Sequence, residues 1–399
     1  MMDAYIYDAV RTPRGSIRKN GSLREVEPIE LVKQLLEALQ KRNHHLTHAI
    51  EDVILGCVTQ IKDQGANIAK TAVTYAGLPY SVPAMTITRF CTSGLDAISI
   101  AASKVHSATQ NVIVAGGVES VSRVPMFSDE GAWFNQVHVS EQTKFLHMGI
   151  SADLMAQLGK IKRQELDAFA VRSHHLAAKA QKENRFHNTV IPVSHQDEVL
   201  LTHDELVRDD ASLETLAALN PSFAPFLTKQ QFATIKSEFP TLSELQHVHH
   251  VGNSPSLADG AALLVIGHEE AQWQLKKPPI AKIIGTLSIA EHPMLLLGGQ
   301  SAAEKLLEKY GFTIDDMDVI EFYEAYAATA VKAMHDWHVP SEKFNPNGGV
   351  IATGHALGAT GAMMVCSLLD ELLHHNGKFG LVTLSGAGGV GTAMIIEKL

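Results

Sequence analysis

Apolar and polar positions alternate along the chain in blocks that are typical of an α/β protein. Short apolar runs at residues 5–10, 53–60 and 111–117 predict buried strands. Longer stretches with helical periodicity predict helices, among them residues 28–42, which begin with a proline, and residues 94–108, which are rich in small side chains. Because strands alternate with helices, we expect an α/β fold with a largely buried sheet.

The middle of the chain, from about residue 122 to residue 250, has a different character. It is more polar, it is predicted to hold most of the long loops, and it contains a helical pattern at residues 163–183. Regular alternation returns at residues 252–267 and continues to the C-terminus. The change predicts a region inserted into an α/β core.

Two segments far apart in the chain share one pattern. Each places a reactive side chain at a turn of small residues, followed by an apolar helix and a strand that ends in glycines. The first segment begins at Cys91 and the second at His355. Duplicated halves would bring the two turns together at one site, whereas a chance likeness of two strand–helix units would carry no such meaning.

The C-terminal segment has the spelling of a dinucleotide-binding fingerprint, Gly386-x-Gly388-x-x-Gly391. That fingerprint needs a helix after the glycines and an acidic residue about 20 positions further on. Only residues 392–399 follow, and they are rich in β-formers. The pattern therefore favours a glycine turn between two strands over a nucleotide site.

Composition narrows the class of protein. The chain has 399 residues, of which 45% are hydrophobic and 19% charged, and its net charge is −10. An acidic balance argues against a broad nucleic-acid surface. There is no apolar run of the roughly 18 residues that a membrane span needs, and the N-terminus does not resemble a signal peptide. With only three cysteines, we expect a cytoplasmic protein with reduced thiols.

Cys91 is the cysteine best placed for chemistry. It stands just before a predicted helix, where the positive end of the helix dipole favours the thiolate and free N–H groups could receive an oxyanion. A buried structural thiol is the alternative, and it fits Cys57 and Cys366 better. His355 lies among glycines that let a ligand approach its ring, and a histidine beside a cysteine can generate a thiolate at neutral pH.

A cluster of three histidines, His247, His249 and His250, raises the alternative of a zinc site. Its spacing matches no closed structural site and no cysteine stands nearby. We therefore expect a loop that happens to be rich in histidine, and no bound metal.

Eight motifs occur in a fixed order along the chain: AYIYDAVRTPRG, RFCTSGLDA, GGVES, HMGISADLMA, GNSPSLADGAA, EFYEAYAA, NPNGGVIATGHALGATGA and SGAGGVG. Together they closely resemble the thiolases, which comprise acetyl-CoA acetyltransferases and 3-ketoacyl-CoA thiolases, over essentially the whole chain. The resemblance implies a thiolase-like duplicated, five-layered α-β-α-β-α fold with an inserted loop domain. The implied N-terminal half spans residues 1–121 plus 251–270, the CoA-binding loop domain residues 122–250, and the C-terminal half residues 271–399.

The resemblance also assigns roles at the place where the halves meet. Cys91 would take the acyl group as a thioester, and His355 would activate it and contribute to an oxyanion hole. The N–H groups of Cys91 and Ala387 would form a second oxyanion hole. Ser385 stands where the family has its proton-shuttling cysteine, and Tyr323 stands where the family has an Asn or His that supports the first oxyanion hole.

The last two positions depart from the family pattern. A serine hydroxyl is a far weaker acid than a thiol, whose pKa is about 8.5, so Ser385 should fail as a general base at neutral pH without help. The Tyr323 hydroxyl can donate to an oxyanion, or the larger ring can simply fill the space of the smaller side chain.

Positions that contact CoA in the family match in part. By resemblance, Arg208 lies near the nucleotide end of CoA with Thr215 nearby, and the pantetheine channel is lined by His147, Met148 and Phe223. Pro255 stands where a pantetheine-contacting serine is common. For Arg208 a solvated charge at a helix start is the alternative.

The sequence thus predicts an acyl-CoA acyltransferase of the thiolase type, which acts by thiolytic cleavage of 3-ketoacyl-CoA or by Claisen condensation through a thioester on Cys91. Its alternatives are a degenerate thiolase-like protein limited to acyl transfer or hydrolysis, and a non-catalytic acyl-CoA-binding subunit. The resemblance implies no tightly bound cofactor, with coenzyme A as substrate or product. It also implies a homodimer or homotetramer, and a partner subunit in fatty-acid oxidation is compatible with it.

Overall fold

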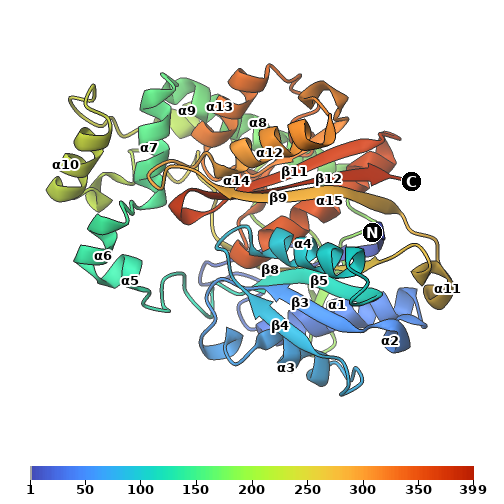
Figure 1. Cartoon of the computed structure of the whole chain (residues 1–399). Helices are drawn as coiled ribbons and strands as arrows, with labels where there is room; N and C mark the ends of the chain where they lie inside the picture. Colours follow the sequence, from blue (N-terminus) through green and yellow to red (C-terminus); the bar gives the residue numbers. More distant parts are fainter. Residues whose placement is uncertain (1) are drawn as a thin grey trace.

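Two layers of strands enclose a pair of helices, and further helices cover both outer faces (Figure 1). The structure is a computed structural model that describes residues 2–399. The two enclosed helices are α4 (Ser93–His106) and α15 (Thr360–His374), which pack against each other. The succession of layers is α-β-α-β-α, so the predicted five-layered thiolase-like fold is confirmed.

The strands form one continuous path in the order β10-β11-β12-β9-β1-β8-β5-β3-β4, with β2 added on β8. The strands of the N-terminal layer are β1 (Ala4–Arg11), β2 (Gly15–Ser16), β3 (Asp52–Gly56), β4 (Ala84–Ile87), β5 (Val112–Glu119) and β8 (Ala258–Gly267). Those of the C-terminal layer are β9 (Ala281–Ala290), β10 (Val319–Phe322), β11 (Phe379–Ser385) and β12 (Val390–Lys398). The two layers are joined where Ala4–Ile6 of β1 pairs with β9.

Each layer combines parallel and antiparallel pairing in a similar way. In the first, β3 is parallel to β4 and β5, while β8 is antiparallel to β5 and β1. In the second, β10 is parallel to β11, while β12 is antiparallel to β11 and β9. The helices α4 and α15 precede β5 and β11 respectively, so the two similar segments seen in the sequence occupy corresponding places in the two halves.

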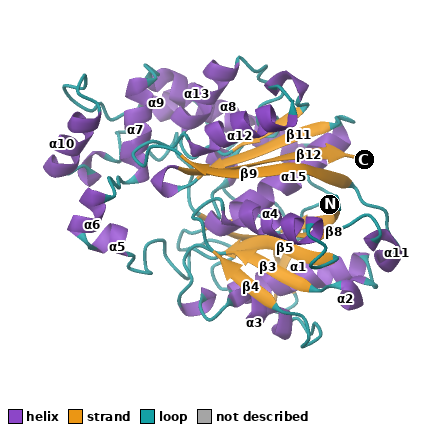
Figure 2. Ribbon diagram, viewed as in Figure 1, coloured by secondary structure: helices purple, strands orange, loops and turns teal. Residues whose placement is uncertain are grey.

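Helices cover the outer faces of the sheets (Figure 2). On the N-terminal side lie α1 (Pro28–Arg42), α2 (Leu46–Ala49), η1 (Lys62–Gln64), α3 (Ile68–Tyr75) and α11 (Ala271–Leu275). On the C-terminal side lie α12 (Gly298–Tyr310), η3 (Ile314–Asp316), α13 (Ala327–Trp337) and α14 (Val350–Thr353), whereas η4 (Leu357–Ala359) packs on β5 and β8 of the N-terminal layer. In α1 the apolar residues Leu31, Leu35 and Leu39 recur every fourth position, and all three are fully buried against the sheet.

The chain between β5 and β8 carries short helices and a small hairpin. Its elements are α5 (Ala132–Asn135), α6 (Val137–Gln142), α7 (Met148–Leu158), α8 (Arg163–Lys182), β6 (Val193–His195), β7 (Glu198–Leu201), α9 (Leu213–Ala217), η2 (Ala224–Phe226) and α10 (Lys229–Glu238). Part of it has a small core of its own, which includes Leu146, Ile150, Leu154 and Ile235. The helix α8 instead packs on α13 and α14 of the C-terminal half.

The C-terminal glycines form a turn between antiparallel strands, as the sequence predicted. The short helix η5 (Ala387–Gly389) connects β11 to β12, and no dinucleotide-type helix follows the glycines within residues 390–399. Gly388 has φ +68°, and a Cβ atom there would stand 2.5 Å from the Trp133 ring. Backbone conformation and close packing both favour glycine, so a phosphate cradle is not needed to explain the pattern.

The predicted strand at residues 53–60 is shorter than the sequence suggested. Strand β3 ends at Gly56, because the N–H groups of Val58 and Thr59 donate to the buried carboxylate of Glu119 rather than to a neighbouring strand. Within residues 2–399, no helix is long and apolar enough to cross a membrane.

Candidate active site

A pocket of about 280 Å³ opens where the two halves and the inserted region meet. Eight of the ten residues to which the sequence analysis assigned site roles line it: Cys91, His147, Met148, Phe223, Tyr323, His355, Ser385 and Ala387. Close backbone contact makes this meeting possible. A Cβ atom on Gly117 would stand 2.3 Å from the Gly358 carbonyl oxygen, so only glycine lets the turn after His355 approach strand β5 so closely.

Cys91 and His355 come from the two turns that share a sequence pattern. The Nε2 atom of His355 lies 3.3 Å from the Cys91 sulfur, and its Nδ1 atom lies 2.8 Å from the Thr360 hydroxyl. When Nδ1 carries the proton and donates to Thr360, Nε2 is free to accept the thiol proton. Phe90, directly before Cys91, has φ +53°, so the nucleophile sits on a sharp, strained bend.

The thiol and the imidazole are both neutral at pH 7. Burial raises the pKa of Cys91 to about 11, although a hydrogen bond from Tyr323 opposes the rise. Burial, with a smaller contribution from Arg14, lowers the pKa of His355 to about 3. Burial therefore opposes the Cys91 thiolate that the helix dipole is expected to favour, because the loss of water destabilises the charged form.

Tyr323 lies against both members of this pair. Its ring centroid is 4.9 Å from that of His355. Burial, together with the nearby thiol, raises the pKa of Tyr323 well above its ordinary value. The side chain therefore fills space against the pair and keeps its proton, and donation from its hydroxyl to an oxyanion stays a prediction.

Ser385 lines the pocket, but its hydroxyl is fully engaged with the backbone. It donates to the Leu296 carbonyl at 2.9 Å and accepts from the Gly299 N–H at 2.9 Å. These bonds fasten the end of β11 to the start of α12. A hydroxyl held in this way has its proton committed to a carbonyl oxygen rather than to the pocket.

Ala387 is the first residue of η5 and lines the same pocket. The N–H of a first helical residue has no partner within its own helix. The glycine turn thus brings Ala387 to the wall of the pocket that Cys91 also lines, and its place in an oxyanion hole stays a prediction.

The inserted region supplies one wall of the pocket. His147 caps α7 by accepting the Gly149 N–H at its Nδ1 atom, and its ring stacks on Phe226 at 4.3 Å. Burial lowers the pKa of His147, which keeps the ring neutral. Phe223 lies between this ring and Tyr326, whose centroid is 5.5 Å away.

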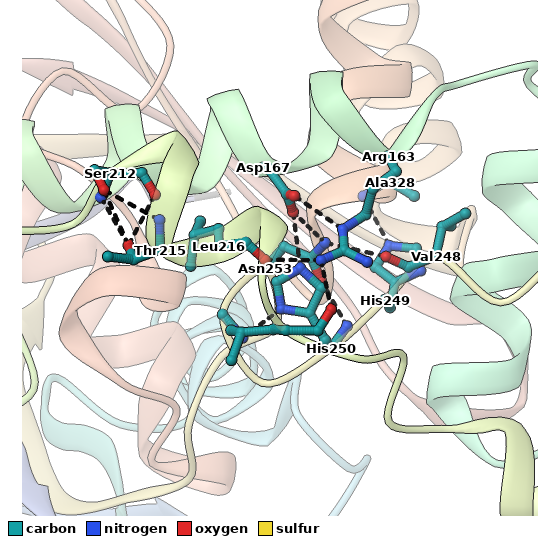
Figure 3. A network of polar contacts seen from close by, with 12 residues as sticks. Arg163, Asp167, Ser212, Thr215, Leu216, Val248, His249, His250, Asn253 and Ala328 are labelled. Atoms are coloured by element: carbon teal, nitrogen blue, oxygen red, sulfur yellow. Dashed lines mark hydrogen bonds and ion pairs between the residues drawn. The ribbon is translucent and has the colours of Figure 1, made fainter.

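Arg208 and Thr215 do not line this pocket. The Arg208 guanidinium contacts the ring of the buried His174 at 2.8 Å. Thr215 is exposed and exchanges hydrogen bonds with Ser212 at the start of α9, as Figure 3 shows. Both residues belong to the inserted region, and their roles toward CoA stay predictions.

The histidine-rich segment is a network of hydrogen bonds with carboxylates. His250 and Asn253 point to the same oxygen of Asp167, at 2.8 and 2.9 Å (Figure 3). The carboxylate of Asp153 binds the Nδ1 atoms of His247 and His249 at 2.7 and 2.8 Å. Across residues 2–399, no group of three or more His, Cys, Asp or Glu side chains is arranged to hold a metal ion.

The sequence reasoning did not identify two residues that support the site, Glu119 and Thr360. Glu119 is fully buried and accepts hydrogen bonds from three backbone N–H groups, which belong to Val58, Thr59 and Gly358. It thereby ties the turn after His355 to the N-terminal half. Glu119 stands in the GGVES motif and Thr360 follows the GHALG stretch, so the motifs pointed to both positions without revealing their partners.

Comparison with protein-family models gives two matches. Residues 4–229 match the model described as "Thiolase, N-terminal domain", and residues 277–398 match "Thiolase, C-terminal domain". Together the two matches cover most of the chain.

Curated relatives match over the full length. The chain is 35% identical to the 3-oxoadipyl-CoA/3-oxo-5,6-dehydrosuberyl-CoA thiolase of Escherichia coli, with 100% of both chains covered. It is 37% identical to the 3-ketoacyl-CoA thiolase of Alcanivorax borkumensis, over 100% of this chain and 98% of the relative. Among solved structures, it resembles the acetyl-CoA acetyltransferase of Bacillus anthracis with a TM-score of 0.86 and 32% identity, covering 100% and 99% of the two chains.

Proposed function

The chain belongs to the thiolase family and is an acyltransferase of the thiolase type, and from that premise we propose that it transfers acyl groups between CoA and a thioester on Cys91. One observation carries the proposal: the Cys91 sulfur lies 3.3 Å from a neutral His355 at the floor of an apolar pocket. Nucleophile and base within hydrogen-bond reach, with Thr360 orienting the base, is the arrangement that covalent acyl transfer needs.

In the cleavage direction the substrate is a 3-ketoacyl-CoA. His355 takes the Cys91 proton, and the sulfur attacks the 3-keto carbon. The bond between C2 and C3 then breaks, which leaves the acyl group on Cys91 and an acetyl-CoA carbanion that takes up the proton His355 removed from Cys91. The thiol of a second CoA then attacks the acyl-enzyme and gives its proton to the neutral His355, which returns it to the departing Cys91 sulfur as a shortened acyl-CoA is released. Claisen condensation is the same sequence in reverse.

The developing negative charges have donors nearby. We assign the Tyr323 hydroxyl to the oxyanion or to the Cys91 thiolate, because Tyr323 lines the same pocket as Cys91 and each group shifts the pKa of the other. The Ala387 N–H serves the thioester oxygen. His147, Met148 and Phe223 would line the path of the pantetheine arm, and Arg208 and Thr215 would lie nearer the nucleotide end of CoA.

The state of Ser385 favours a second candidate function, acyl transfer or thioester hydrolysis without carbon–carbon chemistry. The step at the carbon next to the thioester needs a group that gives and takes a proton there. Ser385 occupies the family's position for that group, but it uses its proton on the Leu296 carbonyl. Either His355 or Tyr323 carries that proton, or the step is lost.

CoA-dependent cleavage of short and medium 3-ketoacyl-CoA by the native protein and by Ser385→Cys tests the proposal. Native turnover within about tenfold of the variant, about 1.4 kcal/mol in barrier, means a thiolase that does not need the thiol. Activity only in the variant selects the second candidate. If neither the native protein nor the variant cleaves these substrates, and intact mass spectrometry detects no acyl adduct on Cys91, both candidate functions are refuted. An adduct that survives in Cys91→Ala would overturn the choice of nucleophile.

Membership of the thiolase family also suggests the oligomeric state, the compartment and the ligands of the protein. We propose a homodimer or homotetramer that works in the cytoplasm on free acyl-CoA and CoA, with no tightly bound cofactor. The three cysteines are free thiols, which fits a reducing compartment. Size-exclusion chromatography with light scattering tests the assembly, and co-purification tests a fatty-acid oxidation partner.

A further inference from the structure

Glu119 is a buried carboxylate that accepts hydrogen bonds from both halves of the molecule. It is the last residue of β5 and is 0% exposed. One oxygen, Oε1, accepts the Thr59 N–H at 3.1 Å and the Gln64 side-chain amide at 2.8 Å. The other, Oε2, accepts the Val58 N–H at 2.8 Å and the Gly358 N–H at 3.0 Å. Three donors lie in the N-terminal half and one in the C-terminal half, so the carboxylate joins the two halves.

The bond to Gly358 holds the turn that carries the base. Gly358 lies three positions after His355, and between them Leu357 has φ +31°, a strained conformation for a residue with a side chain. A Cβ atom on Gly358 would stand 2.9 Å from Glu119 Oε2 and 2.8 Å from the Cys57 Cα, so the turn lies directly on the carboxylate. A strained turn keeps its shape only while its surroundings hold it.

The same turn lies against the helix start that presents the nucleophile. A Cβ atom on Gly94, three positions after Cys91, would stand 2.6 Å from the Gly358 carbonyl oxygen. Gly358 therefore meets the Glu119 carboxylate with its N–H and the first turn of α4 with its carbonyl. Nucleophile and base are thus brought together on the end of β5.

The hydrogen-bond donors to Glu119 are neutral groups, so the carboxylate keeps its negative charge. Each oxygen accepts two N–H groups, and a proton on either oxygen would break one of these bonds. Burial raises the pKa of Glu119, and the four hydrogen bonds oppose the rise. Burial is also the main cause of the raised pKa of the Cys91 thiol, and the charge of Glu119 adds to it. A buried charge acts over a longer distance than one in water.

Among the groups that shift the pKa of Cys91, Glu119 is the charged one. The other titratable side chains in the pocket wall are kept neutral by burial, namely His147, Tyr323, Tyr326 and His355. The thiol in direct contact with Glu119 is that of Cys57, at 3.7 Å from Oε1, and burial together with the carboxylate raises its pKa well above the ordinary value. Glu119 itself does not line the pocket, so it acts on the chemistry through other residues.

We propose that Glu119 is a positioning residue of the acyl-transfer site: its carboxylate holds the His355 turn against the start of α4 and keeps a fixed negative charge beneath the reactive pair. The proposal rests on the proposed function and deepens it. The hydrogen bonds keep His355 within reach of Cys91. The charge opposes a free thiolate, so that the thiol gives up its proton only when His355 takes it.

Two substitutions of Glu119 separate its geometry from its charge. Glu119→Gln removes the charge and turns an NH₂ group toward N–H donors, whereas Glu119→Asp keeps the charge on a side chain too short to reach all four donors. We expect both to lower kcat for thiolysis by about tenfold or more, with less change in KM, because His355 shifts away from Cys91. Alkylation of Cys91 by iodoacetamide at pH 8, followed by peptide mass spectrometry, should be about threefold faster in Glu119→Gln than in Glu119→Asp, because only the first lacks the charge.

Glu324→Gln is the matched control. Glu324 is also 0% exposed, and its carboxylate accepts only from neutral groups, which belong to Ser173, Asn345 and Ile351. It does not contribute to the raised pKa of Cys91, so its variant should lose stability without a change in alkylation rate. Equal alkylation of Glu119→Gln and Glu119→Asp would refute the role of the charge. A kcat within about threefold of the native value in both would refute the positioning role.

Gly358→Ala keeps the inference testable if the Glu119 variants fail to fold, which near-UV circular dichroism shows. The added Cβ atom presses on the Glu119 oxygen and displaces the turn while the charge stays in place. We expect kcat to fall by about tenfold or more, and an unchanged kcat would overturn the inference. If the native protein cleaves no 3-ketoacyl-CoA, the proposed function fails, whereas the alkylation rates of the Glu119 variants still decide whether the charge acts on Cys91.

Discussion

His355 and His249 are both buried histidines, but they have different partners. His249 donates from Nδ1 to the Asp153 carboxylate and accepts the Ala328 N–H at Nε2, so both ring nitrogens are used by the protein. His355 has only a hydroxyl and a thiol as partners, and no carboxylate touches it. The first ring is fixed in place by charge, whereas the second can still take up the proton of Cys91.

The two serines near the pocket show the same contrast. The Ser385 hydroxyl is satisfied by a carbonyl and an N–H of the backbone, whereas the Ser254 hydroxyl has no partner in the described chain. Satisfied polar groups hold the fold together, and unsatisfied ones in a cavity are available to a ligand. Residue type alone does not separate the two classes.

Replacing each histidine in turn is the strongest test of this comparison. We expect His355→Gln to lower kcat/KM for thiolysis by about 100- to 10,000-fold, the usual contribution of a general base, with little change in thermal stability. His249→Gln should do the reverse, lowering the free energy of unfolding while a smaller share of activity is lost. Steady-state kinetics and chemical denaturation of both variants supply the numbers. If His249→Gln loses activity as completely as His355→Gln without unfolding, the contrast is wrong.

Asp153→Asn should be the most destabilising change in the histidine network. Burial alone would raise the pKa of Asp153, but hydrogen bonds from His249 and His247 outweigh it and hold the pKa below its usual value. We expect a loss of about 3 kcal/mol at pH 7, because several hydrogen bonds to a buried charge are weakened. Because the folded pKa of Asp153 lies below its unfolded pKa of about 4, the ionised carboxylate stabilises the fold at pH values above the unfolded pKa. This stabilisation is lost as the pH falls through the folded pKa.

The difference between wild type and Asp153→Asn should therefore be constant from pH 5 to 8 and shrink below about pH 4. Urea denaturation across this range measures it. A difference that grows on acidification would mean that the network is stabilised by protonated histidines rather than by the carboxylate.

Tyr323→Phe removes a hydroxyl that lies beside the reactive pair of Cys91 and His355. Since the pKa of Cys91 is about 11, alkylation of wild type by iodoacetamide should rise steadily with pH through pH 10. Loss of the Tyr323 hydrogen bond should raise the thiol pKa further and slow alkylation on the order of tenfold. Tyr326→Phe is the matched control, because Tyr326 lines the same pocket without a bond to the sulfur. Equal rates for the two variants would remove Tyr323 from its assigned role.

Ser385→Ala should give the smallest effect. If the hydroxyl only fastens β11 to α12, its loss costs about 1–2 kcal/mol of stability through two unpaired backbone groups. Thiolysis at a permissive temperature should then change by less than about tenfold. A drop of a hundredfold or more with unchanged stability would show that Ser385 moves protons after all.

Much of the fold was readable from local pattern. The helix at residues 28–42 and the strand at residues 5–10 were predicted within a residue or two, because strong periodicity and a proline marked them. The end of β3 was not predicted, because it depends on Glu119. This residue is about 60 positions away in the chain, so no local pattern at Gly56 indicates it.

For the site, the motifs identified which residues would meet, and the pocket contains most of them. They could not reveal that Arg208 and Thr215 lie outside its wall, nor that the Ser385 hydroxyl is already bonded. These are statements about partners, and each partner is supplied by another element. Burial opposes the expected Cys91 thiolate for the same reason, because the helix start is local whereas burial comes from every element around it.

The sequence by itself determined the family, the layered architecture and the candidates for nucleophile and base. Periodicity, glycine positions and motif order are properties of the chain alone. Only the tertiary structure decided which of these groups are charged, which hydroxyls are free and which histidines are held by carboxylates. Protonation and hydrogen bonding depend on the loss of water and on neighbours from distant segments, and both arise only when the two halves and the inserted region close around the pocket.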